Sequence, residues 1–209
     1  GGGAGTTDRL GNILSDVFYG SDKEILLAVP LFILAGNLMT HGSIARRLIA
    51  VGKSFTAPIP AGLAVAGVMS CGVFAAISGS SPVTLIAIGG IMYPALRQAG
   101  YSQNLSMGLL AAGGTLGIII PPSIPMIIYA IMVGVSVIDL FVAGVGPGLV
   151  LLTALMIYAM TRGWSMPRGI WQLAEIGAAL KQGVLALMMP VIILGGIYSG
   201  FFKATESAA

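Results

Sequence analysis

The sequence has very little charge: only 8% of its 209 residues are Asp, Glu, Lys or Arg, against about 25% in soluble domains. In contrast, 56% of the residues are hydrophobic and the mean hydropathy is +0.98. Long apolar runs rich in Gly and Ala replace the short alternating segments typical of outer-membrane barrels. The composition therefore excludes a soluble protein and predicts an all-α integral membrane protein, a multi-span helical bundle.

Cysteine and histidine each occur once, as Cys71 and His41. A single cysteine cannot form an internal disulfide, and its place in an apolar segment predicts a packing role. No Asp, Glu or Cys lies near His41 in the sequence, so neither a metal site nor a catalytic histidine is predicted there.

Residues 61–96 contain no charge yet are interrupted in the middle by SGSSP, from Ser78 to Pro82. One unbroken helix over this segment would be about 54 Å long, whereas the hydrocarbon core of a membrane is about 30 Å thick. Two arms folded back at the interruption would each be about 20–25 Å long. The pattern predicts a re-entrant helical hairpin, whose tip ends inside the membrane against protein or a watery cavity.

The tip offers groups for both a cation and an anion. Ser81 suits an N-cap and Pro82 a first helical residue, so the second arm should begin at Pro82 and present free N–H groups. The first arm should end near Ile77 and leave unpaired carbonyls, and Gly79 permits the positive φ angles of a reversal. A tight turn with self-satisfied serines is the alternative to an ion and substrate site. The hydroxyl groups at the tip belong to Ser78, Ser80, Ser81 and Thr84.

A second uncharged segment, residues 104–135, is interrupted by IPPSIP. Two adjacent prolines remove helical hydrogen bonds and free the carbonyls of the preceding turn, around Gly117 to Ile119. The prediction is a broken helix with unwound backbone between two halves, and a simple kink is the alternative. Small residues before the break would let a neighbouring element approach closely. The site candidates from this segment are Gly114, Thr115, Pro121, Pro122 and Ser123.

The remaining segments complete the predicted topology. Residues 25–40 form a first inserted segment after an N-terminal interfacial stretch, and residues 140–160 form an ordinary span. Residues 171–182 suit a short surface helix, after which residues 183–200 insert again. Lys and Arg concentrate in three loops, which the positive-inside rule makes cytoplasmic. These loops are 41–60, 97–103 and 161–182.

The order of these pieces resembles a known family. The motifs that carry the resemblance are PLFILAGNLM, then FAAISGSSPVT with IGGIMYPALRQAGY, then LLAAGGTLGIIIPPSIPMIIYAIMVGV and MMPVIILGGIYSGFFKATESAA. They resemble the large membrane subunit of tripartite ATP-independent periplasmic (TRAP) transporters, especially the dicarboxylate-type branch. The resemblance covers about residues 12–209 and implies that the chain is an N-terminal half, with the second hairpin beyond Ala209.

The resemblance implies a sodium-coupled, elevator-type secondary transporter, with no organic cofactor and no enzyme activity. Its substrate would be an organic acid such as a C4-dicarboxylate, delivered by a periplasmic binding protein, and a small membrane subunit would complete it in the inner membrane. Sodium would bind at Ser78, Gly79, Ser80 and Ser81, and the break at Pro121, Pro122 and Ser123 would meet the tip. Residues 1–60 and 136–182 would be scaffold, 61–135 the transport domain, and 183–209 the start of the second half.

Two other classes of function remain open from the residues. A membrane-embedded serine hydrolase would need a basic partner for a serine of the tip, but His41 and Lys53 both fall in predicted surface loops. A channel or structural subunit without coupled transport would need a continuous polar pore, whereas two interrupted helices favour a closed site at mid-membrane depth.

Overall fold

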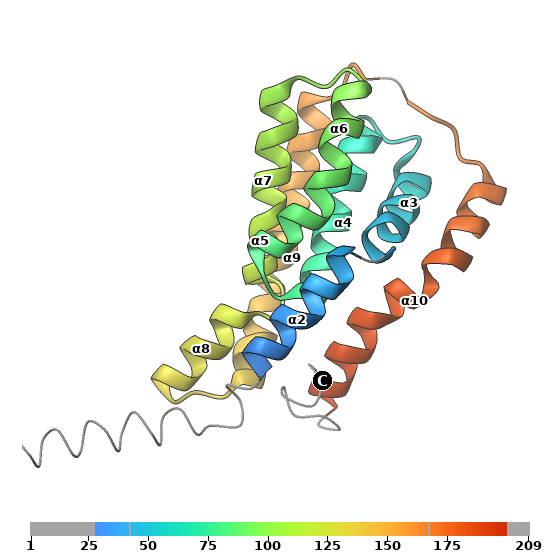
Figure 1. Cartoon of the computed structure of the whole chain (residues 1–209). Helices are drawn as coiled ribbons and strands as arrows, with labels where there is room; N and C mark the ends of the chain where they lie inside the picture. Colours follow the sequence, from blue (N-terminus) through green and yellow to red (C-terminus); the bar gives the residue numbers. More distant parts are fainter. Residues whose placement is uncertain (1–27, 42, 167, 200–209) are drawn as a thin grey trace, which may run out of the picture.

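The computed structural model describes residues 28–41, 43–166 and 168–199, and every regular element in these ranges is a helix (Figure 1). The expected all-α membrane bundle is confirmed, and the N-terminal interfacial stretch lies outside the described residues. In chain order the elements are α2 (Ala28–His41), α3 (Ile44–Thr56), α4 (Gly62–Ser78), α5 (Ser81–Thr84), the π-helix η2 (Leu85–Gly89), α6 (Gly90–Gln98), α7 (Gln103–Ile119), α8 (Ile124–Val133), α9 (Val137–Arg162) and α10 (Leu173–Tyr198).

Three helical segments of the described chain are long and apolar enough to cross a membrane: α7 with α8, α9, and α10. The pair α2 and α3 passes the same test together, but the two helices meet at 67°, as in a broken span or a re-entrant loop. With 17 residues, α4 is about 25 Å long and falls short of the roughly 30 Å hydrocarbon core.

The predicted helical hairpin is present. α4 forms its first arm, and α5, η2 and α6 follow one another without a gap as its second arm. Its two ends lie together, because a Cβ on Gly163, just after α9, would meet both Ala61 Cβ and the Tyr101 ring. In Figure 1 the first arm begins, and the second arm ends, at the end of the molecule at which α7 begins. The hairpin therefore enters and leaves at one end of the bundle.

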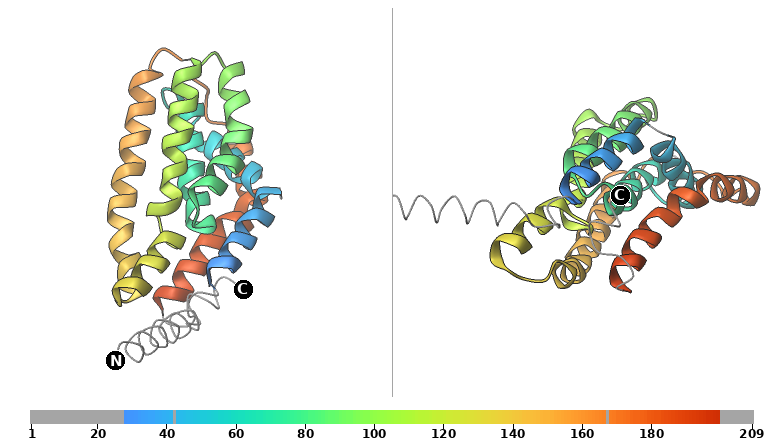
Figure 2. Two further views of the ribbon diagram at one scale, coloured as in Figure 1. Left: turned by 60° about the vertical axis from the view of Figure 1, so that its left-hand side comes forward. Right: turned by 60° about the horizontal axis from the view of Figure 1, so that its bottom comes forward.

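The predicted broken helix is also present, as α7 and α8 with a non-helical stretch between Ile119 and Ile124. Ser102 caps the N-terminus of α7, because its side chain accepts a hydrogen bond from Leu105 N–H. After α8 the chain reverses at Gly134, which has φ +77°, and α9 returns along α4 and α7 (Figure 2).

Two hydrophobic cores hold these helices together. The larger core surrounds α4, where Phe74 and Ile77 pack with Leu116 of α7 and neighbouring residues of α3 and α9. The smaller core joins α2, α8 and α9 through Phe32, Ile127 and other apolar side chains. The hairpin tip adjoins both cores, because Ile77, just before it, belongs to the larger core, and Ile124, which bonds to Gly79 of the tip, packs against the smaller one.

One expectation about the C-terminal part is wrong. α10 runs as a single helix from Leu173 to Tyr198, so no break separates a surface helix at 171–182 from an inserted segment beginning at 183. Gly183 lies inside α10 and has a packing role. It lets α10 approach α3 closely, since a Cβ at this position would lie 2.6 Å from Val51 Cγ2. Arg47 strengthens this contact by donating a hydrogen bond to the Gln182 carbonyl at 3.2 Å.

Candidate functional site

The tip of the hairpin contacts the break in the α7–α8 helix. The amide of Ile124 donates a hydrogen bond to the Gly79 carbonyl at 3.1 Å, although the two residues are 45 positions apart in the sequence. A Cβ on Gly79 would be only 2.8 Å from the carbonyl oxygen of Pro122. The two interruptions that the sequence predicts therefore meet in space, backbone against backbone.

The first arm ends one residue later than expected, at Ser78 instead of Ile77. Gly79 is its C-cap, with φ +60° and ψ 13°, and its N–H donates to the Ala75 carbonyl at 3.1 Å. An L-residue with a side chain disfavours this left-handed conformation, so glycine suits the reversal for two reasons: its φ angle and its contact with Pro122.

The predicted start of the second arm is wrong by one residue. Ser80 is the N-cap, with extended φ −140° and ψ 129°, whereas Ser81 and Pro82 are the first and second helical residues. The amides of a helix's first turn have no intrahelical partner, so proline loses nothing at the second position either. No side chain caps this helix.

The second half of the broken helix begins in the same way. Ser123 is its N-cap, with φ −132° and ψ 127°, and Pro125 occupies its second position. Both helices thus begin with a Ser-x-Pro sequence, both N-cap serines leave the first-turn amides uncapped, and the first amide of α8 bonds to Gly79. The positive end of α8 is thus one hydrogen bond away from Gly79, the residue directly before the N-cap of α5.

The hydroxyl groups of the tip divide into two sets. Ser78 and Thr84 are fully buried, and their side-chain oxygens are 2.8 Å apart. The Thr84 hydroxyl also donates to the Ser80 carbonyl at 2.9 Å, so this pair ties the end of the first arm to the start of the second. In contrast, Ser80 and Ser81 are half-buried, and within the described chain their hydroxyls make no hydrogen bond.

The hydroxyl of Ser123 has a structural partner at the break. It donates to the Ile118 carbonyl at 2.8 Å, which is one of the carbonyls that the double proline was expected to free. Ser123 is fully buried, and the adjacent Pro121 and Pro122 are buried as well. The break is therefore a closed backbone structure, flanked by the exposed side chains of Ile118 and Pro125.

The structure brings Gly114 to the hairpin but leaves Thr115 away from it. A Cβ on Gly114 would lie 3.0 Å from Leu85 Cβ and 3.5 Å from the Ser81 carbonyl, as a close approach requires. Thr115 is exposed, and its hydroxyl donates to the Ala112 carbonyl of its own helix.

Two glycines that the sequence reasoning left out lie at the tip. A Cβ on Gly117 would be 2.5 Å from the Ser80 carbonyl oxygen, the tightest contact between α7 and the tip. Gly36 brings α2 against Val83 and Ser78, with Cβ distances of 3.1 and 3.6 Å. The sequence features that could have indicated these contacts are the position of both glycines in apolar segments and, for Gly117, its place one helical turn before the double proline.

None of the residues at the tip or the break has a side chain that titrates near neutral pH. The groups on offer are neutral oxygens and uncapped helix amides. Lys53 lies far from them, since it lines a cavity of ≈380 Å³ with Gly62 and Tyr101 at the opposite end of α4. The side chain of His41 lies outside the described residues. Hydroxyl and carbonyl oxygens can coordinate a cation, and helix amides can donate hydrogen bonds to an anion or another polar group.

Comparisons with known proteins agree with this architecture. Residues 7–209 match the model of the DctM component of the tripartite ATP-independent periplasmic transporter. The chain is 44% identical over 207 residues to the C4-dicarboxylate TRAP transporter large permease protein DctM of Pseudomonas aeruginosa, covering 97% of the chain and 48% of that protein.

Relatives with other named substrates are almost as similar. The ectoine TRAP transporter large permease protein TeaC of Halomonas elongata is 41% identical, covering 98% of the chain and 49% of that protein. The 2,3-diketo-L-gulonate TRAP transporter large permease protein YiaN of Escherichia coli is 37% identical, covering 91% of the chain and 45% of that protein. The chain spans about half the length of these relatives. It belongs to the DctM family of tripartite ATP-independent periplasmic transporter permeases.

Proposed function

We propose that this chain supplies one half of the ion and substrate site of a sodium-coupled importer of organic acids, which moves its hairpin by an elevator mechanism. The observation that carries the proposal is the hydrogen bond from Ile124 N–H to the Gly79 carbonyl. It joins the hairpin tip to the broken helix, so two helix starts and a non-helical backbone come together where interrupted helices of transporters bind their ligands.

Sodium is the coupling ion that suits these groups. The tip has hydroxyl and carbonyl oxygens but no carboxylate, and a proton needs a titratable acceptor whereas Na⁺ accepts neutral oxygen ligands. Ser80 and Ser81 contribute hydroxyls that have no partner in the described chain, and Ser78 and Gly79 hold the backbone of the tip. The relatives are about twice as long as this chain, and we assign the remaining ligands to a segment corresponding to their other half.

The substrate class follows from the anion-binding character of the helix starts. The amide of Ile124 is bonded to Gly79, and Pro82 and Pro125 have no N–H, but the other first-turn amides of α5 and α8 and the positive ends of both helices favour a carboxylate. C4-dicarboxylate, ectoine and 2,3-diketo-L-gulonate, the molecules named for the relatives, all carry a carboxylate group. A C4-dicarboxylate is the specific proposal, in line with the 44% identity to the Pseudomonas protein.

The full-length protein would act in the inner membrane with two partners, a small membrane subunit and a periplasmic binding protein that delivers the acid. The basic loops around 41–60, 97–103 and 161–182 would face the cytoplasm. Transport is then measured as sodium-dependent uptake of a labelled dicarboxylate into proteoliposomes that contain both membrane subunits, with the binding protein added outside. Equal uptake with and without a sodium gradient would contradict the coupling.

Bulky residues at the tip should stop transport without unfolding the protein. We expect Ser80→Leu and Ser81→Leu to reduce sodium-dependent uptake to background, because both side chains are half-buried beside the helix starts. Ser165→Leu, an exposed serine after α9, is the control and should keep uptake. Wild-type uptake in both tip variants would refute the assignment.

The hydrolase alternative lacks its basic partner in the described part of the chain. Lys53 lines a cavity with Gly62, at the start of α4, whereas the serines follow its end at Ser78. Labelling of a tip serine by a fluorophosphonate would favour the hydrolase instead. A channel would show itself by uptake that continues down a concentration gradient without the binding protein.

A further inference from the structure

A polar cavity lies between the start of α7 and the end of α9, away from the hairpin tip. Its volume is ≈410 Å³, and it is lined by Ser102, Asn104, Leu105, Tyr158 and Arg162. Tyr158 and Arg162 are one helical turn apart and share a face of α9. The Ser102 hydroxyl accepts a hydrogen bond from Leu105 N–H at 3.3 Å, which fixes the facing turn of α7. The cavity is thus built from two helices, and the start of α7 that lines it is held by a side-chain cap.

The chemistry of this lining suits a phosphate group. Arg162 is exposed, and it forms no ion pair within the residues that the structure describes. A guanidinium binds phosphate through two parallel hydrogen bonds, and the Asn104 amide and the Tyr158 hydroxyl are further donors. No carboxylate lines the cavity, so nothing there competes for the guanidinium or repels an anion.

The surroundings of the cavity favour a lipid as the source of the phosphate. α9 is long and apolar enough to cross a membrane, and its side chains Val150 and Ile157 are 69% and 61% exposed, roughly a third of a turn around the helix from Arg162. Exposed apolar side chains on a membrane helix suit acyl chains, while Tyr158 is a side chain typical of the membrane–water interface.

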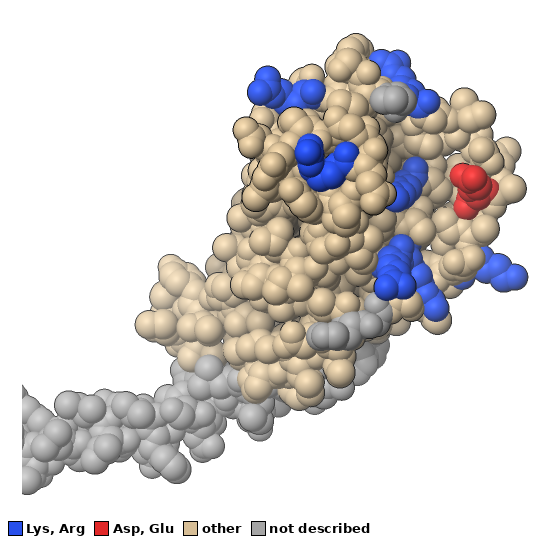
Figure 3. Space-filling view, turned by 45° about the horizontal axis from the view of Figure 1, so that its top comes forward, with Lys and Arg blue, Asp and Glu red and all other residues tan. Residues whose placement is uncertain are grey.

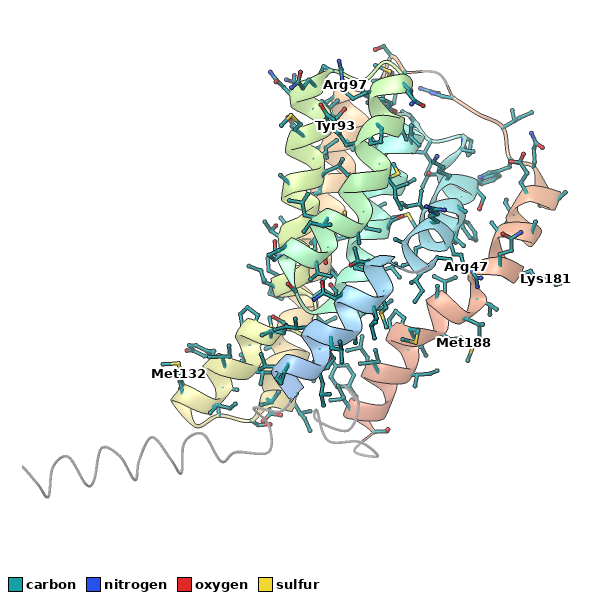
Figure 4. The ribbon with its side chains drawn as sticks, viewed as in Figure 1. Arg47, Tyr93, Arg97, Met132, Lys181 and Met188 are labelled. Carbon is teal, nitrogen blue, oxygen red and sulfur yellow. The ribbon has the colours of Figure 1, made fainter. Side chains whose placement is uncertain are left out.

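The charge of the molecule favours an anionic lipid. Among the charged side chains on the face shown in Figure 3, Lys and Arg form several patches and Asp and Glu only one, and Figure 4 places Arg97 at the same end of the bundle as the start of α7. Basic pockets between membrane helices bind anionic headgroups. Within the described residues the basic side chains are Arg46, Arg47, Lys53, Arg97, Arg162, Arg168 and Lys181, and the acidic ones are Asp139 and Glu175.

We propose that this cavity binds the phosphate group of an anionic phospholipid, with the lipid's acyl chains lying along the exposed face of α9. The site does not depend on the transport function proposed above, because it uses none of the tip residues. A lipid bound here would hold the start of α7 against the end of α9.

The test compares two charge-removing variants of the full-length protein, Arg162→Gln and Arg46→Gln. Both arginines are exposed, but Arg46 lies on α3 outside the cavity. Each protein, purified in detergent, is titrated with phosphatidylglycerol or phosphatidylcholine, and bound lipid is counted by native mass spectrometry. We expect Arg162→Gln to weaken phosphatidylglycerol binding about tenfold or more, as loss of a charged hydrogen bond does. Arg46→Gln should leave it unchanged.

Four results would overturn the proposal. Equal loss in both variants would mean that phosphatidylglycerol responds only to overall charge. Equal binding of phosphatidylcholine and phosphatidylglycerol by the wild-type protein would remove the preference for an anionic headgroup. Inorganic phosphate that displaces phosphatidylglycerol at equal concentration would identify a free-anion site instead of a lipid site. Asn104→Leu is a second variant within the cavity. Unchanged phosphatidylglycerol binding in both Arg162→Gln and Asn104→Leu would exclude this cavity altogether.

Discussion

Individual hydroxyl groups at the hairpin tip have different tasks. Ser78 and Thr84 are fully buried and bonded to each other, so they hold the tip together. Ser80 and Ser81 are half-buried and have hydroxyls without a partner in the described chain, so they are the ones available to an ion. Substitutions of the first pair should therefore affect stability, and substitutions of the second pair should affect transport.

Removing the Thr84 hydroxyl should destabilise the protein. Thr84→Val keeps the shape of the side chain but removes its hydrogen bonds to the buried Ser78 hydroxyl and to the Ser80 carbonyl, which leaves Ser78 Oγ only its longer bond of 3.4 Å to that carbonyl. A lost hydrogen bond costs about 0.5–1.5 kcal/mol, so the thermal midpoint in detergent should fall. Thr153→Val is the control, because this exposed threonine bonds only to carbonyls of its own helix. Equal midpoints for the two variants would argue against a structural role for the Ser78–Thr84 pair.

A side chain at Gly79 should cost more than its left-handed backbone alone explains. Gly79→Ala and Gly134→Ala both place alanine at positive φ, which costs about 1–2 kcal/mol. Only at position 79 does the new Cβ meet a backbone atom, the Pro122 carbonyl oxygen at 2.8 Å, whereas the space around Gly134 is open. We expect a clearly larger fall in thermal midpoint for Gly79→Ala, and the contact with Pro122 would be unimportant if the two falls were the same.

At the scale of the elements, α7 is the helix against which the hairpin closes. Gly114 and Gly117 let it approach the start of the second arm, and the π-helix η2 lies in the same contact. This tight fit of helix against helix explains why α7 carries small residues at a spacing of three. It also means that the hairpin cannot shift along α7 without displacing backbone atoms.

Two glycines of α7 should respond in opposite ways to alanine. Gly117→Ala would place a Cβ 2.5 Å from the Ser80 carbonyl oxygen and should destabilise the protein and lower uptake. Gly108→Ala meets nothing within 4 Å, so it should be neutral or stabilise α7 by up to about 1 kcal/mol. Thermal midpoints and sodium-dependent uptake of both variants check this. A neutral Gly117→Ala variant would show that the tip can move away from α7.

The sequence predicted the large features better than the fine ones. A charge-free segment too long for one span indicated the hairpin, and the double proline indicated the break, because both signals are local. The N-cap at Ser80 and the close approach at Gly117 were not predicted, since each depends on a contact between segments distant in the chain. Gly183 was read as the start of a new segment for the same reason, although it serves a helix–helix contact.

At the scale of the whole molecule, the two hydrophobic cores lie on either side of the hairpin tip. The larger core holds the hairpin arms to α7, α9, α3 and α10, and the smaller one holds α2 and α8 to α9 and the end of α10. Large apolar side chains elsewhere are exposed, for instance Met132 at 81% and Val191 at 68%. Since the chain spans about half the length of its relatives, lipid and the remainder of the full-length protein are the surroundings expected for these faces.

The central claim is that the hairpin tip lies inside the membrane-embedded part of the protein and binds sodium there. A cysteine replaces Ser80 in the full-length protein, and its rate of modification by a membrane-impermeant thiol reagent is measured with and without sodium. Ser136→Cys and Ser102→Cys, exposed positions before α9 and α7, serve as controls from the two sides of the membrane. The account predicts slow modification at position 80 that sodium slows further. Modification at the rate of the controls, independent of sodium, would contradict it.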